Sequence, residues 1–179
     1  MATIFTHALV VLTAGRISGQ QRRIVVCGVA LALLPDVDVA GLPFGIPHED
    51  LFGHRGFTHS LVFALATAAI ATWVILRGSQ FRAAAWRNTL IFLFACAASH
   101  GLLDAMTNGG SGIAFFSPFS NTRYFLPWRP LEVSPIGRDF FSSEGLDTLA
   151  SEARWLWLPC AGAWLGSRLV RWRRSNGRR

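Results

Sequence analysis

The stretch Gly53-His54-Arg55-Gly56-Phe57-Thr58-His59-Ser60 is the starting point for interpreting this chain. It places two imidazoles, a guanidinium and two hydroxyls directly before an apolar run at residues 61–76. Neutral imidazole is the commonest metal ligand and is well suited to acid–base chemistry near neutral pH. We therefore expect this octapeptide to supply part of a metal site at the mouth of a hydrophobic helix.

The composition narrows the class of protein. Of the 179 residues, 51% are hydrophobic and only 15% are charged, whereas soluble domains contain about 25% charged residues. All basic residues are arginine, and the formal net charge is +7. The length suits a single domain, residues 1–179, with a basic tail at 171–179. A membrane protein and a deeply buried helical bundle both fit these values.

Five apolar segments that lack period-2 alternation predict helices. They lie at residues 4–14, 24–34, 61–76, 90–105 and 155–170. Pro35 ends the second of them. Residues 107–152 are rich in Gly, Pro, Ser and aromatic side chains, which predicts a long folded loop. We expect an all-α integral membrane protein with about five apolar helices and this loop before the last one.

Arginines gather in three places, at residues 16–23, 77–87 and 168–179. If the chain crosses the membrane five times, all three groups lie on one side, which the positive-inside rule makes cytoplasmic. The residues at 35–60 and 106–153 then face the non-cytoplasmic side, and the C-terminal tail is cytoplasmic. A soluble helical bundle with basic turns is the alternative interpretation.

Histidine and aspartate residues fall at the ends of the apolar segments that face the non-cytoplasmic side. They are His7, Asp36, Asp38, His54, His59, His100 and Asp104. His100 and Asp104 are four residues apart, so they share one helical face. Mixed His and Asp ligands favour Zn, Mn or Fe over Ca, and the set is large enough for one or two divalent ions. Arg55 or Arg123 would neutralise a bound phosphate.

Each of these pieces also has a purely structural interpretation. A lone His7 fits a buried histidine that is satisfied by its neighbours. Asp36 and Asp38 fit a turn or a helix cap, and the octapeptide fits a capped helix start. The joint placement of these residues favours a site, because ionisable groups inside a membrane protein are costly and tend to be functional.

Five pieces of sequence, occurring in order, resemble the bacterial YdjM-like family of membrane-bound metal-dependent hydrolases, some of whose members are regulated by the LexA stress repressor. The pieces are THALV at 6–10, LLPDVD at 33–38, GHRGFTHS at 53–60, SHGLLDAMT at 99–107 and FSPFSNTRYFLPWRP at 116–130. The resemblance implies a multi-pass protein of the bacterial inner membrane with a metal-dependent hydrolytic site.

More distantly, the order His, Asp, His, HxxxD is similar to that of the zinc-dependent phospholipase C group, in which such residues bind metal ions and water attacks a phosphodiester. The likeness implies metal ligands at His7, Asp36, His59, His100 and Asp104. It leaves Asp38 and His54 as ligands or as acid–base groups. Because this chain lacks the later His and Glu ligands of that group, one or two ions are expected and not three.

The function expected from these observations is hydrolysis of a phosphoester or related bond in a lipid or lipid-linked substrate by metal-activated water, with Zn or Mn as the ion. The expected catalytic residues are His54, Asp38 and Arg55, and Arg123 is the expected substrate contact. A non-catalytic membrane protein with a structural metal, acting in a stress response, is the alternative. Nucleic acid is not an expected partner, because no helix carries a basic face with base-reading residues.

Overall fold

The computed structural model describes residues 1–48, 50–78 and 82–176. The α-helices are α1 (Ile4–Ser18), α2 (Arg22–Leu33), α3 (Leu61–Leu76), α4 (Ala83–Ala105), α5 (Ser143–Glu152) and α6 (Leu158–Asn176). Short 3-10 helices are η1 (Leu34–Phe44), η2 (Phe57–His59) and η3 (Gly137–Phe141), and the π-helical η4 (Ala153–Trp157) joins α5 to α6. The described residues contain two isolated β-bridges and no strand, so the all-α prediction is confirmed.

Helices α2, α3 and α4 enclose the main apolar core. Its fully buried members include Ala68 of α3 and Leu93 of α4. Small residues let the helices approach closely, as is common in membrane bundles. A Cβ added to Gly28 would lie 3.0 Å from Cys96 Sγ and 3.2 Å from Val11 Cγ1. This one glycine therefore permits the contact of α2 with both α1 and α4.

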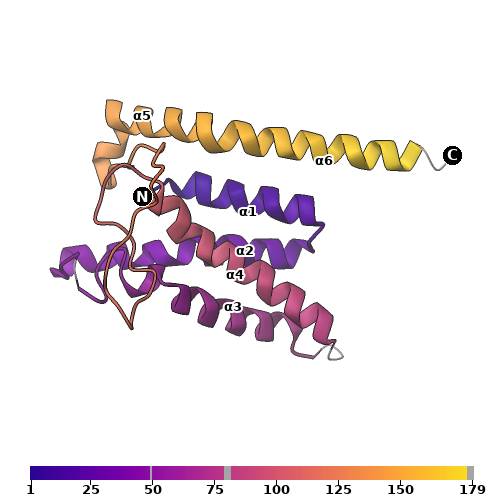
Figure 1. The fold of residues 1–179 in the computed structure, drawn as a ribbon, viewed down its shortest axis with the longest axis horizontal. Coiled ribbons are helices and arrows are strands. Elements are labelled where there is room, and N and C mark those ends of the chain that lie inside the picture. Colours follow the sequence, from indigo (N-terminus) through magenta and orange to yellow (C-terminus); the bar gives the residue numbers. More distant parts are fainter. Residues whose placement is uncertain (49, 79–81, 177–179) are drawn as a thin grey trace.

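The C-terminal helices run along the outside of α1 (Figure 1). Arg171 of α6 donates from Nη1 to the carbonyl oxygen of Arg16 at 3.0 Å, near the C-terminal end of α1. Trp157 of η4 donates to Thr6 Oγ1 at 2.7 Å, near the N-terminal end of α1. These two contacts fix the long C-terminal helical segment against α1 at both ends.

The up-and-down path of the chain separates the bundle into two ends (Figure 1). The connection of α1 to α2, the C-terminal end of α3 and the C-terminal end of α6 lie at one end. The N-terminus, η1 and the irregular segment after α4 lie at the other. The predicted separation of arginine-rich turns from the His and Asp residues is therefore present in the fold.

Within the part of the chain that the structure describes, two helical segments are long and apolar enough to cross a membrane, Arg22–Gly41 and Ala83–Ala105. The apolar helices α1 and α3 are shorter, with 15 and 16 residues. At about 1.5 Å per residue, 16 residues measure about 24 Å, which is less than a hydrocarbon core of about 30 Å. The prediction of about five apolar membrane helices is thus supported in part, and the number of crossings stays a prediction.

Several predicted boundaries differ from the structure. The fourth apolar segment was expected to begin at residue 90, but α4 begins at Ala83, because the Ala-rich run before it also favours helix. The expected loop at 107–152 contains α5, whose N-cap Ser142 accepts a hydrogen bond from Glu144 N. The predicted basic tail at 171–179 is helical as far as Asn176, and its last three residues lie outside the described part.

The rest of the predicted loop, residues 106–136, is irregular and lies over the same end of the bundle as η1 (Figure 1). Backbone hydrogen bonds hold it in place. Ile113 and Tyr124 exchange N–H···O bonds of 2.9 and 3.0 Å, and Leu61 N donates to Phe115 O at 3.0 Å. The loop is therefore anchored to the start of α3, directly beside the octapeptide at 53–60.

Candidate metal centre

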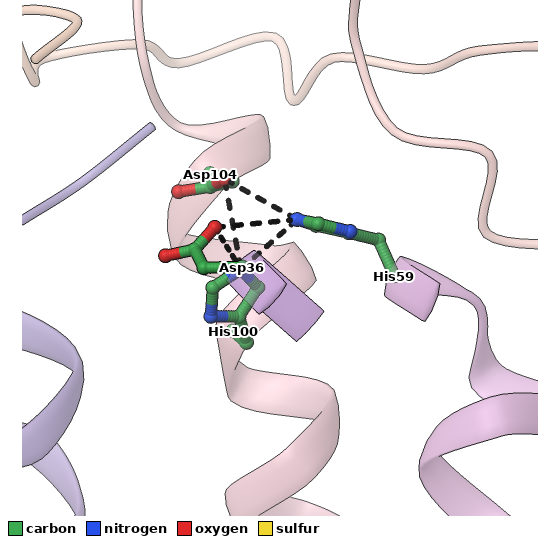
Figure 2. Close-up of side chains that lie close together, drawn as sticks. All are labelled: Asp36, His59, His100 and Asp104. Carbon is green, nitrogen blue, oxygen red and sulfur yellow. Dashed lines mark hydrogen bonds and ion pairs between the residues drawn. The ribbon is translucent and has the colours of Figure 1, made fainter. Parts of the chain in front are cut away.

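Four side chains from three segments converge at the loop-covered end of the bundle (Figure 2). Asp36 comes from η1, His59 from η2, and His100 and Asp104 from the last turns of α4. The Nε2 atoms of the two histidines are 3.0 Å apart. His100 Nε2 is 3.3 Å from Asp36 Oδ1, and both Nε2 atoms are 3.8 Å from Asp104 Oδ2.

These separations match those between ligands that share one ion. Tetrahedral ligands about 2.0–2.2 Å from a zinc ion lie about 3.4 Å from one another. One ligand atom of each of the four residues lies within 4.8 Å of the others. The group is therefore able to hold a divalent ion with little movement.

Hydrogen bonds fix which nitrogen of each histidine faces the centre. His100 Nδ1 is 2.7 Å from Ala32 O, which only accepts, so Nδ1 carries the hydrogen. His59 Nδ1 is 3.2 Å from Asp38 Oδ2. Both Nε2 atoms then present lone pairs toward the same point. Metal-binding histidines are held in this way, with the second nitrogen donating to a carbonyl or a carboxylate.

The carboxylates at the centre lack the hydrogen bonds that buried oxygens normally have. Both oxygens of Asp36 and Oδ2 of Asp104 are buried and have no hydrogen-bond partner among the described residues. Asp104 Oδ1, in contrast, accepts from Ala2 N at 2.7 Å. Because buried charged oxygens are paired or bind metal, the orphaned atoms indicate a cation at this point.

The net charge of the side chains around the centre also indicates a bound cation. Three buried or half-buried carboxylates, those of Asp36, Asp38 and Asp104, surround the centre, and among the described residues the Arg55 guanidinium is paired with one of them, Asp104. With neutral histidines this set carries about two negative charges, which one divalent ion would balance. The pKa of His59 reflects the same excess of negative charge. Burial lowers this pKa, but the neighbouring carboxylates of Asp36 and Asp38 outweigh the effect of burial and raise the pKa above its usual value.

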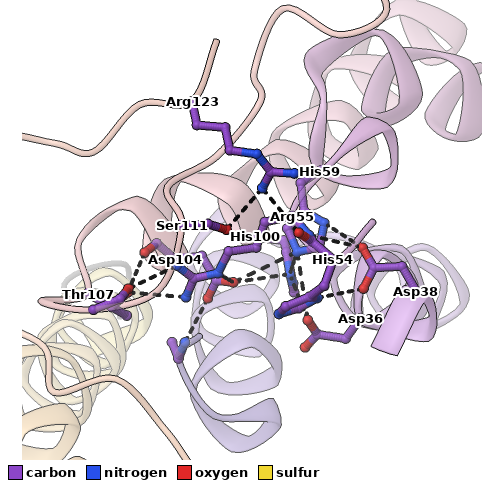
Figure 3. Close-up of polar contacts among 12 residues, drawn as sticks. Asp36, Asp38, His54, Arg55, His59, His100, Asp104, Thr107, Ser111 and Arg123 are labelled. Atoms are coloured by element: carbon purple, nitrogen blue, oxygen red, sulfur yellow. Dashed lines mark hydrogen bonds and ion pairs between the residues drawn. The ribbon is translucent and has the colours of Figure 1, made fainter. Parts of the chain in front are cut away.

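Asp38 is differently placed, because each of its oxygens already has donors (Figure 3). Oδ1 lies 2.6 Å from His54 Nδ1, and Oδ2 accepts from Thr58 Oγ1 at 2.6 Å and from Arg55 N at 3.3 Å. Asp38, His54 and His59 also form a group with metal-ligand spacing. Since the orphaned oxygens lie in the other group, Asp38 is better described as a carboxylate that orients His54 and His59.

The 3-10 geometry of η1 explains why two nearby aspartates face different partners. Successive residues of a 3-10 helix are about 120° apart, so residues i and i+2 point in different directions. Asp36 therefore faces the two histidine Nε2 atoms while Asp38 faces His54. The sequence predicted that both carboxylates reach the site, and the structure divides their contacts.

Arg55 is enclosed in the wall of the site and has 2% of its surface exposed. Its Nε lies 3.7 Å from Asp104 Oδ2, Nη1 donates to Gly109 O at 3.0 Å, and Nη2 donates to Thr107 Oγ1 at 3.3 Å. Gly110 packs on the guanidinium with φ +89°, and a Cβ there would lie 2.3 Å from Arg55 Nη1. Glycine is therefore required at this position.

Arg123 ties three loop segments together (Figure 3). Its Nη1 donates to His54 O and to Ser111 Oγ, both at 3.1 Å, and Nη2 donates to His48 O. The predicted substrate contact is thus engaged with backbone carbonyls of the octapeptide region. Its role as a substrate contact stays a prediction.

His7, a predicted ligand, lies beside the four-residue group. Its ring stacks on His100 with centroids 4.1 Å apart, and its Nε2 is 3.5 Å from Asp104 Oδ1. Both ring nitrogens are buried without a hydrogen-bond partner among the described residues. His7 therefore contacts the side of Asp104 that faces away from the other three residues, and its role as a ligand stays a prediction.

A second buried carboxylate, Glu152 at the end of α5, was not singled out by the sequence analysis. It accepts from Thr3 N at 2.5 Å, from Thr3 Oγ1 at 2.6 Å and from Thr6 Oγ1 at 2.7 Å. It therefore caps the start of α1, next to Ala2, which contacts Asp104. The one signal in the sequence was an acidic residue directly before the last apolar segment.

We expect Glu152→Ala to lower the free energy of unfolding by about 3 kcal/mol, because three buried donors lose a charged acceptor. Thermal unfolding in detergent measures the effect. Asp147→Ala, which changes an exposed carboxylate on the same helix, is the matched control and should have little effect. Equal losses from the two variants would contradict the capping role of Glu152.

Comparison with known proteins places the chain in a family. A family model described as YdjM inner membrane protein matches residues 1–175. The chain belongs to the YdjM inner membrane protein family. It is 40% identical over 163 residues to the inner membrane protein YbcI of Escherichia coli (strain K12), a match that covers 89% of this chain and 92% of that protein. No solved structure gives a significant match.

The resemblance expected from the five sequence pieces is therefore confirmed, and so is its implication of an inner membrane protein. The family description and the name of the relative state a location and no reaction. The function of the site is therefore inferred from its own residues.

Proposed function

We propose that the protein is a metal-dependent hydrolase of the inner membrane that cleaves a phosphoester or related bond in a lipid or lipid-linked substrate. One divalent ion, Zn or Mn, is held by Asp36, His59, His100 and Asp104. The observation that carries the proposal is the pair of histidine Nε2 atoms 3.0 Å apart. Both face carboxylate oxygens of Asp36 and Asp104 that accept no hydrogen bond from the described residues.

A divalent ion in this position supplies a Lewis acid and lowers the pKa of a coordinated water. The chain supplies the proton-transfer group beside it. Asp38 holds His54 through Nδ1 at 2.6 Å, which leaves Nε2 to carry a proton to or from the substrate. The His54 ring is 5.4 Å from the ring of His59, in an edge-to-face contact. His54, the proposed general acid–base group, therefore contacts the ligand His59 without itself being one of the four ligands.

The two arginines act differently in this proposal. Arg55 offsets the charge of Asp104 and forms part of the wall that His54 also lines. Arg123 holds the backbone of His48 and His54 in place. Neither guanidinium is needed to bind the ion.

A structural metal in a non-catalytic membrane protein is the second candidate function. The specific observation that favours it is the burial of the group: His59, His100 and Asp104 are each no more than 4% exposed. Structural zinc sites are closed by four protein ligands, whereas catalytic sites keep an open position. The Asp36 side chain, at 11% exposed, is the most accessible member.

A substrate screen separates the two candidates. Metal-loaded protein in detergent is assayed against phosphomonoesters, phosphodiesters and acyl esters, and the same protein stripped by chelator is the control. The hydrolase proposal expects turnover in at least one class that disappears on stripping and returns with Zn or Mn. Full metal occupancy with no turnover in any class would support the structural role.

We also propose that the site faces the non-cytoplasmic side and that the C-terminus is cytoplasmic, because the arginine-rich turns lie at the opposite end of the bundle from the site (Figure 1). A C-terminal alkaline phosphatase fusion is expected to be inactive in cells, and a green fluorescent protein fusion at the same point is expected to fluoresce. An active phosphatase fusion with a dark fluorescent one would reverse the topology.

A further inference from the structure

A small cavity of about 100 Å³ is lined by His54 and Arg55, which also contact residues of the candidate metal centre. Its walls come from four segments: Met1, the octapeptide region with His48, the turn at Gly110 and Ser111, and the chain at 133–136. At about 30 Å³ per water molecule, it has room for about three waters. That is enough for one compact polar group, and a larger ligand would extend beyond the cavity.

The polar side chains that line the cavity include a permanent cation, the Arg55 guanidinium. They are His48, His54, Arg55, Ser111 and Ser134, and none of the described lining residues carries a carboxylate. Ser111 Oγ accepts from Arg123 Nη1 at 3.1 Å, so its hydroxyl hydrogen is left to donate. A lining that holds a guanidinium, hydroxyls and imidazoles and has no carboxylate suits an oxyanion.

The cavity shares two walls with the metal centre. His54 lines it and also contacts Asp38 and the ring of His59. Arg55 lines it and also contacts Asp104. A group bound in the cavity would therefore contact the proposed proton-transfer residue and would be separated from the proposed ligands by His54 and Arg55.

We propose that this cavity is a subsite for a phosphate group, either free phosphate or the terminal phosphate of a lipid. The inference rests on the proposed function in that the phosphate would belong to the substrate or product of the same site. It specifies a compact, terminal phosphate, which a phosphodiester buried between two bulky groups does not present.

Binding of orthophosphate to the purified, detergent-solubilised protein tests the subsite, with the metal content of each sample measured in parallel. Ser134→Leu fills the cavity without altering a proposed ligand. It is expected to weaken phosphate binding at least tenfold. Ser143→Leu, an exposed serine at the start of α5, makes the same substitution away from the cavity and should bind phosphate like the wild type.

The source of the phosphate is read from competition. Phosphatidic acid in mixed micelles displaces orthophosphate if the group is carried by a lipid, whereas phosphatidylcholine, which has no terminal phosphate, does not. Orthophosphate binding without displacement by phosphatidic acid identifies a soluble phosphate compound. Either result supports a phosphate subsite.

Two results overturn the inference: no orthophosphate binding to wild-type protein, or equal binding to wild-type and Ser134→Leu protein. In the second case the phosphate contacts the ion alone, and the hydrolase proposal still stands. Conversely, wild-type protein that takes up no Zn or Mn, yet binds phosphate and loses it on Ser134→Leu, would retain the subsite and contradict the metal-dependent reaction.

Discussion

His59→Ala and Asp104→Ala should each remove the metal ion from the protein, weakening its affinity for Zn or Mn by about 100-fold or more. Changes to residues that merely orient metal ligands already cost about 10–100-fold, and these two residues supply ligand atoms themselves. His59 Nε2 is 3.0 Å from His100 Nε2, and Asp104 Oδ2 is 3.8 Å from both nitrogens. Metal content by elemental analysis and affinity by metal-buffered titration measure the change.

His48→Ala is the matched control for His59→Ala, because it removes an exposed imidazole that lies outside the four-residue group. Its metal content should equal that of the wild type. Circular dichroism establishes that each variant remains helical. If His59→Ala and Asp104→Ala were folded and kept their full metal content, the assignment of these two ligands would be wrong.

His54→Ala is expected to lower turnover by about 10²–10⁴-fold while leaving the metal content unchanged, which is the usual contribution of a positioned acid–base group. The residue contacts Asp38 at 2.6 Å and lies outside the four-residue ligand group. Asp38→Asn should reproduce part of the loss, because it weakens the orientation of the imidazole.

The pH dependence of kcat distinguishes the loss of an acid–base group from a general disruption of the site's structure. If His54 transfers the proton, the wild-type plot of kcat against pH should have a limb that reports the titration of His54. That limb should be missing from the plot for His54→Ala. A variant that loses its metal together with its activity would show that His54 is a ligand. A variant with unchanged turnover would show that another group moves the proton.

Much of the candidate site could be predicted from the sequence, because its residues lie at the ends of apolar helical segments. The spacing of His100 and Asp104 places both on one face of α4, and the structure brings them within reach of the same point. The octapeptide was expected to enter the third helix, and Ser60 is indeed the N-cap of α3, accepting from Phe63 N at 3.1 Å. Local periodicity and capping chemistry were enough for these features.

The different contacts of Asp36 and Asp38 could not be predicted from the sequence, because they depend on the local backbone conformation. Whether Asp36 or Asp38 faces the centre follows from the 3-10 turn after Pro35, and the sequence showed only that α-helix ends there. Arg123 was expected to face a substrate, but its contacts are largely with carbonyl oxygens, which every residue possesses. No residue pattern can reveal a carbonyl acceptor.

The α5 helix and Glu152 were missed for a different reason. The segment 143–152 is short and polar and ends a stretch rich in Gly, Pro, Ser and aromatic residues, so the sequence predicted a loop there. Its position is set by long-range contacts of Glu152 with Thr3 and Thr6, which are almost the whole chain away. Contacts of such large sequence separation leave no local signal.

Elemental analysis of the wild-type protein, purified without chelator, tests the metal centre most directly. The four convergent side chains and their orphaned oxygens predict about one equivalent of Zn or Mn per chain, reduced to background in His59→Ala. Wild-type protein that is folded, contains no divalent metal and takes none up from buffered Zn or Mn would contradict the metal centre and the hydrolase proposal that depends on it.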